Sequence, residues 1–218
     1  MRVLGLTGGI ACGKSNVSDA LRALGAYIID GDVISRELTA PGGAALGDIR
    51  ATFGDGVFQT TGELDRRALG QLIFEDDAQR ARLDALMQPL IRRRIGEELA
   101  RAEAQGEEFA VLDMPLLYEA GLETLCHRVW CVSLPPEEQL RRLMERDGLT
   151  SAQARSRIAS QMPTAEKERR ADVVIDTSGS IRYTRDSIPP LLEEERRLAA
   201  EAQRSDYGTD NTGAPQAR

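Results

Sequence analysis

The sequence predicts an α/β fold in which helices flank a parallel β-sheet. An apolar run over 3–7 enters a glycine-rich turn, and apolar spacing suited to a helix follows over 15–24. A second apolar run at 27–30 completes the order strand, turn, helix, strand, which is that of a βαβ unit. Further buried-strand patterns stand at 109–113, 128–134 and 172–176.

Composition limits the classes of protein that remain. The chain has 218 residues, of which 41% are hydrophobic and 29% charged, so it can bury a core as one domain, or as a core with insertions. Its net charge of −7 makes nucleic acid or an anionic membrane an unexpected partner. No apolar run reaches the length of a membrane span, and the first residues do not form a secretory signal.

The first elements are set by turn and cap signals. Gly25 is a plausible end for the helix over 15–24, and the strand over 27–30 ends in an acid. The stretch 34–106 differs, because glycine-rich turns are followed by long patterns rich in Ala, Leu, Arg and Glu. We expect a helical insertion there rather than more sheet.

The second half returns to alternating strands and helices. Two prolines and two acids at 135–138 open a helix that runs to about Arg146. Residues 150–170 are charged and helical, with a cap at 150–151. A terminal helix is expected over 189–204, and the polar tail 205–218 is expected to be disordered.

A phosphate-binding loop is the clearest motif. Residues 8–15, GGIACGKS, match G-x-x-x-x-G-K-[ST], with a strand before and a helix after. Glycines let backbone N–H groups turn inward, where they and the helix N-terminus attract phosphate oxygens. Lys14 would reach the β- and γ-phosphates, and Ser15 would place its hydroxyl on Mg²⁺. The alternative is a glycine turn that only joins a strand to a helix.

The motif alone does not name a reaction. An NKxD sequence is absent, and no acidic pair follows the strand over 109–113, so a small-molecule kinase is favoured over a GTPase or a motor. Asp32 follows the strand over 27–30 and is the candidate base for an acceptor hydroxyl. Asp30 and Asp32 could each instead cap the next helix, and capping is the favoured role for Asp30.

Other charged residues fit the same chemistry. Asp113 ends a buried strand, which suits a place beside Mg²⁺, although it could instead cap a loop. Arg142 and Arg146 share a helix face and could meet charge on a transferred phosphate. For any one arginine, the alternative is a solvated helix face; the others considered are Arg141, Arg155 and Arg157.

The three cysteines form no CxxC pair and are odd in number, which suits a reducing cytosol and gives no structural zinc site. His127 is the only histidine, so a histidine-based metal cluster is excluded. Cys12 lies at a helix N-terminus, where a thiol pKa can fall. One hypothesis is therefore that oxidation of Cys12 lowers activity; the alternative is an inert thiol.

In combination these segments resemble the dephospho-CoA kinase family over about residues 3–180. The matching segments are GLTGGIACGKS (5–15), IDGDVISREL (29–38), PGGAALGDIRATFG (41–54), GELDRRALGQLIFEDD (62–77), LMQPLIRRR (86–94), DMPLLYE (113–119), LRRLMERDG (140–148), RIASQ (157–161) and ADVVIDTSG (171–179). The phosphate loop is common to many families, but the order of the segments after it is much more specific.

The resemblance implies transfer of the γ-phosphate of ATP to the ribose 3′-hydroxyl of dephospho-CoA, with Mg²⁺, in the cytoplasm. It implies a P-loop nucleoside/nucleotide-kinase-like core, a helical CoA-binding insertion and a small lid. We expect the core at 1–33, 107–143 and 166–204, the insertion at 34–106 and the lid at 144–165. The expected assembly is a monomer or a small homo-oligomer.

The resemblance also assigns roles to residues. Asp32 matches the proposed base, Lys14 the loop lysine, and Arg142 the arginine that approaches the transferred phosphate. The nucleotide side comprises Gly8, Gly9, Ile10, Ala11, Cys12, Gly13, Lys14, Ser15, Asn16 and the lid-hinge Arg146, with Ser15 toward the metal. The acceptor side comprises Asp32, Arg36, Asp65, Arg66, Asp113 and Leu116.

Some positions depart from the family pattern. Ala11 stands where glycine is usual and is expected to be tolerated if its φ is negative. Gln88 replaces a usual histidine, and Thr177 replaces an asparagine near the adenine. Two other functions stay open at this point: a kinase of the same core with another acceptor, and a nucleotide-gated binding protein without turnover.

Overall fold

The computed structural model describes residues 1–208 and contains a five-stranded, wholly parallel sheet in the order β2-β3-β1-β4-β5. The strands form where the apolar runs predict them, and the expected α/β fold is confirmed. Their bounds are β1 Arg2–Gly8, β2 Tyr27–Asp30, β3 Phe109–Asp113, β4 Arg128–Ser133 and β5 Val173–Asp176.

The register brings chemically active residues to one edge of the sheet. Asp113 at the end of β3 is level with both Leu6 of β1 and Asp30 of β2. Gly8, the last residue of β1, is level with Val132 of β4. Because parallel strands present their C-terminal ends together, the phosphate-loop motif and both acids meet at one edge.

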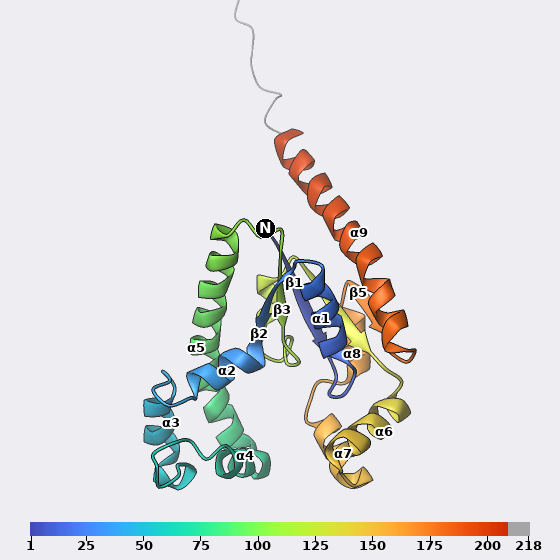
Figure 1. Ribbon diagram of the computed structural model, residues 1–218. Helices are drawn as coiled ribbons and strands as arrows, with labels where there is room; N and C mark the ends of the chain where they lie inside the picture. Colours follow the sequence, from blue (N-terminus) through green and yellow to red (C-terminus); the bar gives the residue numbers. More distant parts are fainter. Residues whose placement is uncertain (209–218) are drawn as a thin grey trace, which may run out of the picture.

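Helices lie on both faces of the sheet (Figure 1). Figure 1 shows α2–α5 grouped on one side of this edge and α6 and α7 on the other. Within residues 1–208, no helix is both long and apolar enough to cross a bilayer. The helices are α1 Lys14–Ala23, α2 Gly31–Leu38, α3 Leu46–Phe53, α4 Arg66–Glu75, α5 Asp77–Ala104, α6 Pro136–Asp147, α7 Ser151–Ala159, α8 Thr164–Arg170 and α9 Ile181–Gly208, with short 3₁₀ turns η1 Asp55–Val57 and η2 Leu122–Leu125.

Two apolar cores hold these layers together. On one face, Leu4 and Leu6 of β1 pack with residues of α1 and α9, including Leu21 and Ile188. On the other face, Val3 packs with the helical insertion. Neighbouring residues of β1 serve opposite cores because strand side chains alternate between faces. A strand buried on both sides reads as a continuous apolar run, which is why the sequence predicts it.

The end of the chain differs from the prediction. Helix α9 begins at Ile181 rather than at Pro189, and both Pro189 and Pro190 lie inside it. Burial of Ile188 and Leu192 against α1 outweighs the lost backbone hydrogen bonds. The disordered tail predicted for 205–218 is wrong for 205–208, which continue α9; its remainder lies outside the described residues.

A buried carboxylate joins α9 to the sheet. Glu195 is only 1% exposed and accepts hydrogen bonds from Arg2 Nε (2.9 Å) and Trp130 Nε1 (3.1 Å). The guanidinium of Arg128 lies 3.3 Å from the same carboxylate. Removing this acid would leave the buried Trp130 Nε1 and the partly buried guanidinium groups of Arg2 and Arg128 without this acceptor.

We therefore expect Glu195→Ala to lower the free energy of unfolding by about 3 kcal/mol, because a buried charge network loses its centre. The measurement is urea unfolding followed by circular dichroism. Glu194→Ala is the control, since Glu194 pairs with Arg197 at the surface. That variant should change stability by less than about 0.5 kcal/mol. Equal effects of the two substitutions would contradict the role given to Glu195.

Candidate active site

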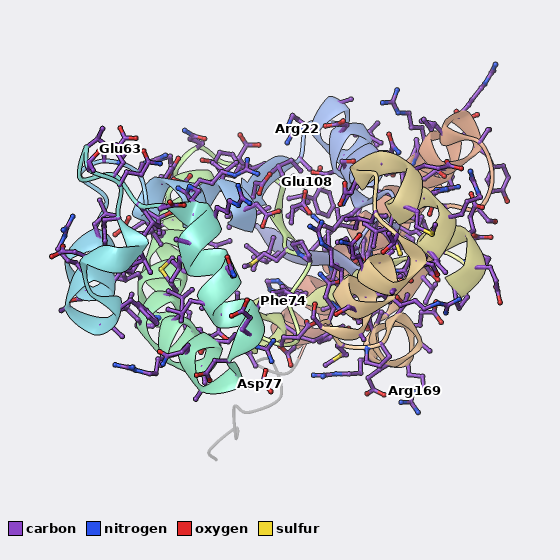
Figure 2. All side chains as sticks on the ribbon, turned by 90° about the horizontal axis from the view of Figure 1, so that it is seen from below. Arg22, Glu63, Phe74, Asp77, Glu108 and Arg169 are labelled. Atoms are coloured by element: carbon purple, nitrogen blue, oxygen red, sulfur yellow. The ribbon has the colours of Figure 1, made fainter. Side chains whose placement is uncertain are left out.

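A cavity of about 880 Å³ opens at the C-terminal edge of the sheet. Its lining comes from the phosphate loop, α2, α5, the 114–120 loop and three residues of the 142–161 segment. Figure 2, which views the molecule from below, shows α3–α5 on one side of this edge and α6–α8 on the other. Segments far apart in the sequence thus share one site.

The phosphate loop is built around left-handed backbone. Gly13, with φ of 81°, is the N-cap of α1, and Cys12 N donates to Gly9 O at 3.1 Å. Gly9 has no room for a side chain, because a Cβ there would stand 2.5 Å from Gln139 Nε2 and 2.6 Å from Thr164 Oγ1. A loop of this kind turns successive N–H groups toward one concave space that suits an anion.

Side chains from distant segments fix this loop. Gln139 of α6 donates to Ile10 O at 2.9 Å, and Gln161 accepts from Ile10 N at 3.0 Å. Thr177 donates to Cys12 O at 2.7 Å. Sequence reasoning missed both glutamines, and it associated Thr177 with the adenine. The one available signal was weak: Gln139 is a polar residue on the buried face of its helix.

The condition under which Ala11 was expected to be tolerated, a negative φ, is not met. Its φ is 62°, the left-handed region, where it is the one non-glycine residue among those described. A side chain there costs roughly 1–2 kcal/mol because Cβ approaches the carbonyl oxygen. The loop needs left-handed backbone at both Ala11 and Gly13 to turn its N–H groups inward, and the anchors at Ile10 and Cys12 hold this strained conformation.

Replacing Ala11 by glycine should therefore raise the free energy of unfolding by about 1 kcal/mol, as the strain is relieved. The measurement is urea unfolding, with ATP affinity measured alongside to confirm that the loop still binds phosphate.

Ala81→Gly is the matched control, because Ala81 lies in helix α5, where glycine costs about 1 kcal/mol. If both substitutions destabilised the protein equally, the strain at Ala11 would be refuted.

Lys14 forms an ion pair with Asp113. The Lys14 side chain is 18% exposed and Asp113 is 6% exposed, so the pair is largely shielded from water. Asp113 was expected beside Mg²⁺ and on the acceptor side, or as the cap of a loop. The structure pairs it with the loop lysine, and it is not among the residues that line the cavity. Phosphate oxygens entering the loop would compete with Asp113 for the Lys14 ammonium.

The two neighbouring acids after β2 have separate roles. Asp30 Oδ1 accepts from the N–H groups of Asp32 (2.8 Å) and Val33 (3.1 Å), so Asp30 is the N-cap of α2. Asp32 is exposed and lines the cavity, and it contributes only its backbone N–H to the cap, so its carboxylate takes no part in capping. Capping by Asp30 is confirmed, and Asp32 is left available to a ligand.

Two of the predicted arginines reach the cavity, Arg142 and Arg146. Arg142 is held by Glu138 (2.9 Å) and by Thr177 O (3.0 Å). Hydrogen bonds from Arg141 and Arg142 lower the pKa of the Glu138 carboxyl to about 2, so this partner is ionised at neutral pH. Arg146 pairs with Asp147.

The other three predicted arginines do not line the cavity. Arg141 pairs with Glu138 and Glu145, Arg157 pairs with Asp147, and Arg155 is exposed.

The acceptor-side residues are only partly brought together. Leu116 lines the cavity and is 45% exposed. Asp65 instead caps α4, and Arg66 donates to carbonyl oxygens at the end of α2, including that of Arg36 (3.3 Å). None of Arg36, Asp65 and Arg66 is in the lining.

The sequence analysis assigned no role to the wall of the cavity that α5 forms. Its residues are Leu83, Asp84, Met87, Gln88 and Ile91. Burial raises the pKa of the Asp84 carboxyl within it.

Cys12 does not have the reactive thiol that its position suggested. It is 1% exposed, and burial raises the pKa of its thiol to about 11. The hypothesis of a lowered pKa is wrong, because desolvation outweighs the helix N-terminus. All three cysteines are free thiols, two of them buried.

Over residues 1–208, no group of three His, Cys, Asp or Glu side chains forms a metal cage.

An anchored phosphate loop, a lysine, a cavity-facing acid and two arginines define a P-loop kinase for a small molecule. Residues 2–183 match the protein family described as dephospho-CoA kinase. The chain is 48% identical over 180 residues to the dephospho-CoA kinase of Anaeromyxobacter dehalogenans, covering 83% of this chain and 85% of the relative. It is 44% identical to that of Bacillus licheniformis, covering 88% and 95%.

Solved structures agree with this match. "TT1252" from Thermus thermophilus superposes with a TM-score of 0.76 at 34% identity, covering 88% of this chain and 97% of that one. The dephospho-CoA kinase from Campylobacter jejuni gives 0.68 at 28% identity, covering 91% and 100%. The chain belongs to the dephospho-CoA kinase family. Its activity is the ATP-dependent phosphorylation of dephospho-CoA to CoA, which confirms the predicted function and does not favour a different acceptor.

Proposed function

We propose that Asp32 is the base of this reaction and that the ribose 3′-hydroxyl of dephospho-CoA is its acceptor. The observation that supports this is the shared cavity: the Asp32 carboxylate and the phosphate loop both line it. A carboxylate beside the γ-phosphate accepts the hydroxyl proton and orients the oxygen for in-line attack. CoA and ADP are the products.

The nucleotide side consists of the loop 9–16, Lys14 and Arg142. Inward N–H groups hold the phosphates, and Lys14 exchanges Asp113 for phosphate oxygens. Arg142 meets charge that develops on the transferred group, from a position set by Glu138 and Thr177 O. Arg146, at the end of α6, lies at the hinge of the lid.

Mg²⁺ fits the residues present. This cation favours one or two protein oxygens together with substrate phosphates and waters, rather than a complete protein cage. Ser15 offers a hydroxyl in the cavity lining, and Asp113 becomes available when Lys14 turns to phosphate. When bound, the ion neutralises charge on the β- and γ-phosphates.

The acceptor side is the part of the cavity away from the phosphate loop, between α5 and the 114–120 loop. The insertion 34–106 supplies α5 to this part of the cavity, and Leu116 of the 114–120 loop also lines it. This supports the insertion as the CoA-binding part.

The segment 144–165 is proposed as a lid whose closure excludes water, since an open site would hydrolyse ATP. Free thiols at Cys12, Cys126 and Cys131 suit a reducing compartment, the cytoplasm.

The test uses Asp32→Asn, a substitution that preserves shape and removes the base. We expect kcat to fall by about 100-fold or more, while the Kd for ATP changes little. ADP release is followed with and without dephospho-CoA, and the product is identified by its added phosphate mass. Asp48→Asn, on the exposed face of α3 and outside the cavity, is the control.

Two results would count against the proposal. Wild-type kcat in Asp32→Asn would remove Asp32 from its role as base. ATP binding by the wild-type protein without release of ADP that depends on dephospho-CoA would leave the phosphate site standing and discard this acceptor.

A further inference from the structure

Lys167 is a buried charge that the reaction described above does not use. Of the 28 basic residues, only Lys14 and Lys167 are lysines. One of them serves the phosphate loop. The other lies on α8 with 0% exposure, so its charge cannot be explained as a solvated helix face.

The ammonium of Lys167 joins two separate parts of the chain. Nζ donates to Pro115 O at 2.5 Å and lies 2.9 Å from Glu119 Oε1. Thr7 Oγ1 also donates to Pro115 O, at 3.0 Å. Glu119 in turn accepts from Met162 N at 2.9 Å, in the connection before α8. The 114–120 loop is therefore tied to α8 at both its near and its far end.

This loop forms a wall of the cavity. Its lining residues are Met114, Pro115, Leu116, Glu119 and Ala120. The loop has no strand ladder or regular helix of its own. Burial of Leu117 and Tyr118 holds its inner side to the core, whereas Pro115 and Glu119, which line the cavity, are held by these polar ties. Because the phosphate loop takes the nucleotide, the space between this wall and α5 is the part left for the acceptor.

A lysine suits this position better than an arginine or an apolar residue. Its compact tetrahedral head donates to a carbonyl and a carboxylate at once, whereas a guanidinium needs a planar fork of acceptors. Replacing a whole buried ion pair by apolar residues of similar volume is often neutral or stabilising, so stability alone does not explain why an ion pair stands here. The ammonium of Lys167 contributes something that an apolar residue does not: its two polar contacts fix the distance between α8 and the 114–120 loop.

We propose that Lys167 is a positioning residue that sets the acceptor wall of the cavity through Pro115 O and Glu119. The proposal rests on the assignment of dephospho-CoA to the space beside this wall. Loss of the ammonium lets the 114–120 loop shift, which misplaces the acceptor relative to the γ-phosphate and leaves the phosphate loop in place. A positional error of this kind is felt in acceptor kinetics before nucleotide binding.

The experiment measures kcat and both KM values for Lys167→Met in the full chain, with folding checked by circular dichroism. We expect the KM for dephospho-CoA to rise about tenfold and kcat to fall, while the KM for ATP stays within about twofold. Arg169→Met, on the exposed face of the same helix, is the control and should leave all three unchanged.

A second variant keeps the test valid if Lys167→Met does not fold. Glu119→Gln retains the size and an acceptor oxygen but removes the charge that holds Lys167. It should raise the same KM by about threefold, and Lys167→Met/Glu119→Gln should be no worse than Lys167→Met, because both act through one tie.

Three results are decisive. A Lys167→Met enzyme with lower stability but wild-type KM for dephospho-CoA would show a purely structural lysine and overturn the proposal. If that variant does not fold, an unchanged KM in Glu119→Gln overturns it. Failure of the wild-type protein to use dephospho-CoA at all is a separate result, seen before any variant is made, and refutes the acceptor assignment instead.

Discussion

The active site depends on one constraint, which is that the backbone of the phosphate loop must hold a curved conformation that a phosphate can enter. Left-handed conformations at Ala11 and Gly13 produce this geometry, and the one at Ala11 is unfavourable without support because its Cβ approaches a carbonyl oxygen. Support comes from hydrogen bonds to the loop by Gln139, Gln161 and Thr177, which belong to three different segments. The loop is thus shaped before phosphate arrives, and one of its anchors, Gln161, belongs to the proposed lid 144–165.

Charge is arranged locally in an otherwise acidic chain. The net charge is −7, yet both substrates are polyanions. Three cations reach the cavity, Lys14, Arg142 and Arg146, and each already has a carboxylate partner. Paired cations cost less to hold in a partly buried site than unpaired ones. We expect phosphate oxygens to replace such carboxylates, so that nucleotide binding at Lys14 would also release Asp113.

The sequence predicts features that depend on neighbouring residues. The strands, the GGIACGKS loop and the difference between Asp30 and Asp32 all follow from local patterns. The loop anchors do not, because Gln139 and Gln161 meet Ile10 across more than a hundred residues. Burial of Cys12 and the early start of α9 also depend on tertiary packing, which outweighs a helix N-terminus in one case and two prolines in the other.

We expect the phosphate loop to keep its present shape, and Lys14 to exchange Asp113 for phosphate, when the nucleotide binds. A crystal structure with Mg²⁺ and a non-hydrolysable ATP analogue tests it most directly. The backbone over 9–14 should be unchanged, with Lys14 Nζ on phosphate oxygens and no longer on Asp113. A refolded loop, or a bound triphosphate with the Lys14–Asp113 pair intact, would contradict it.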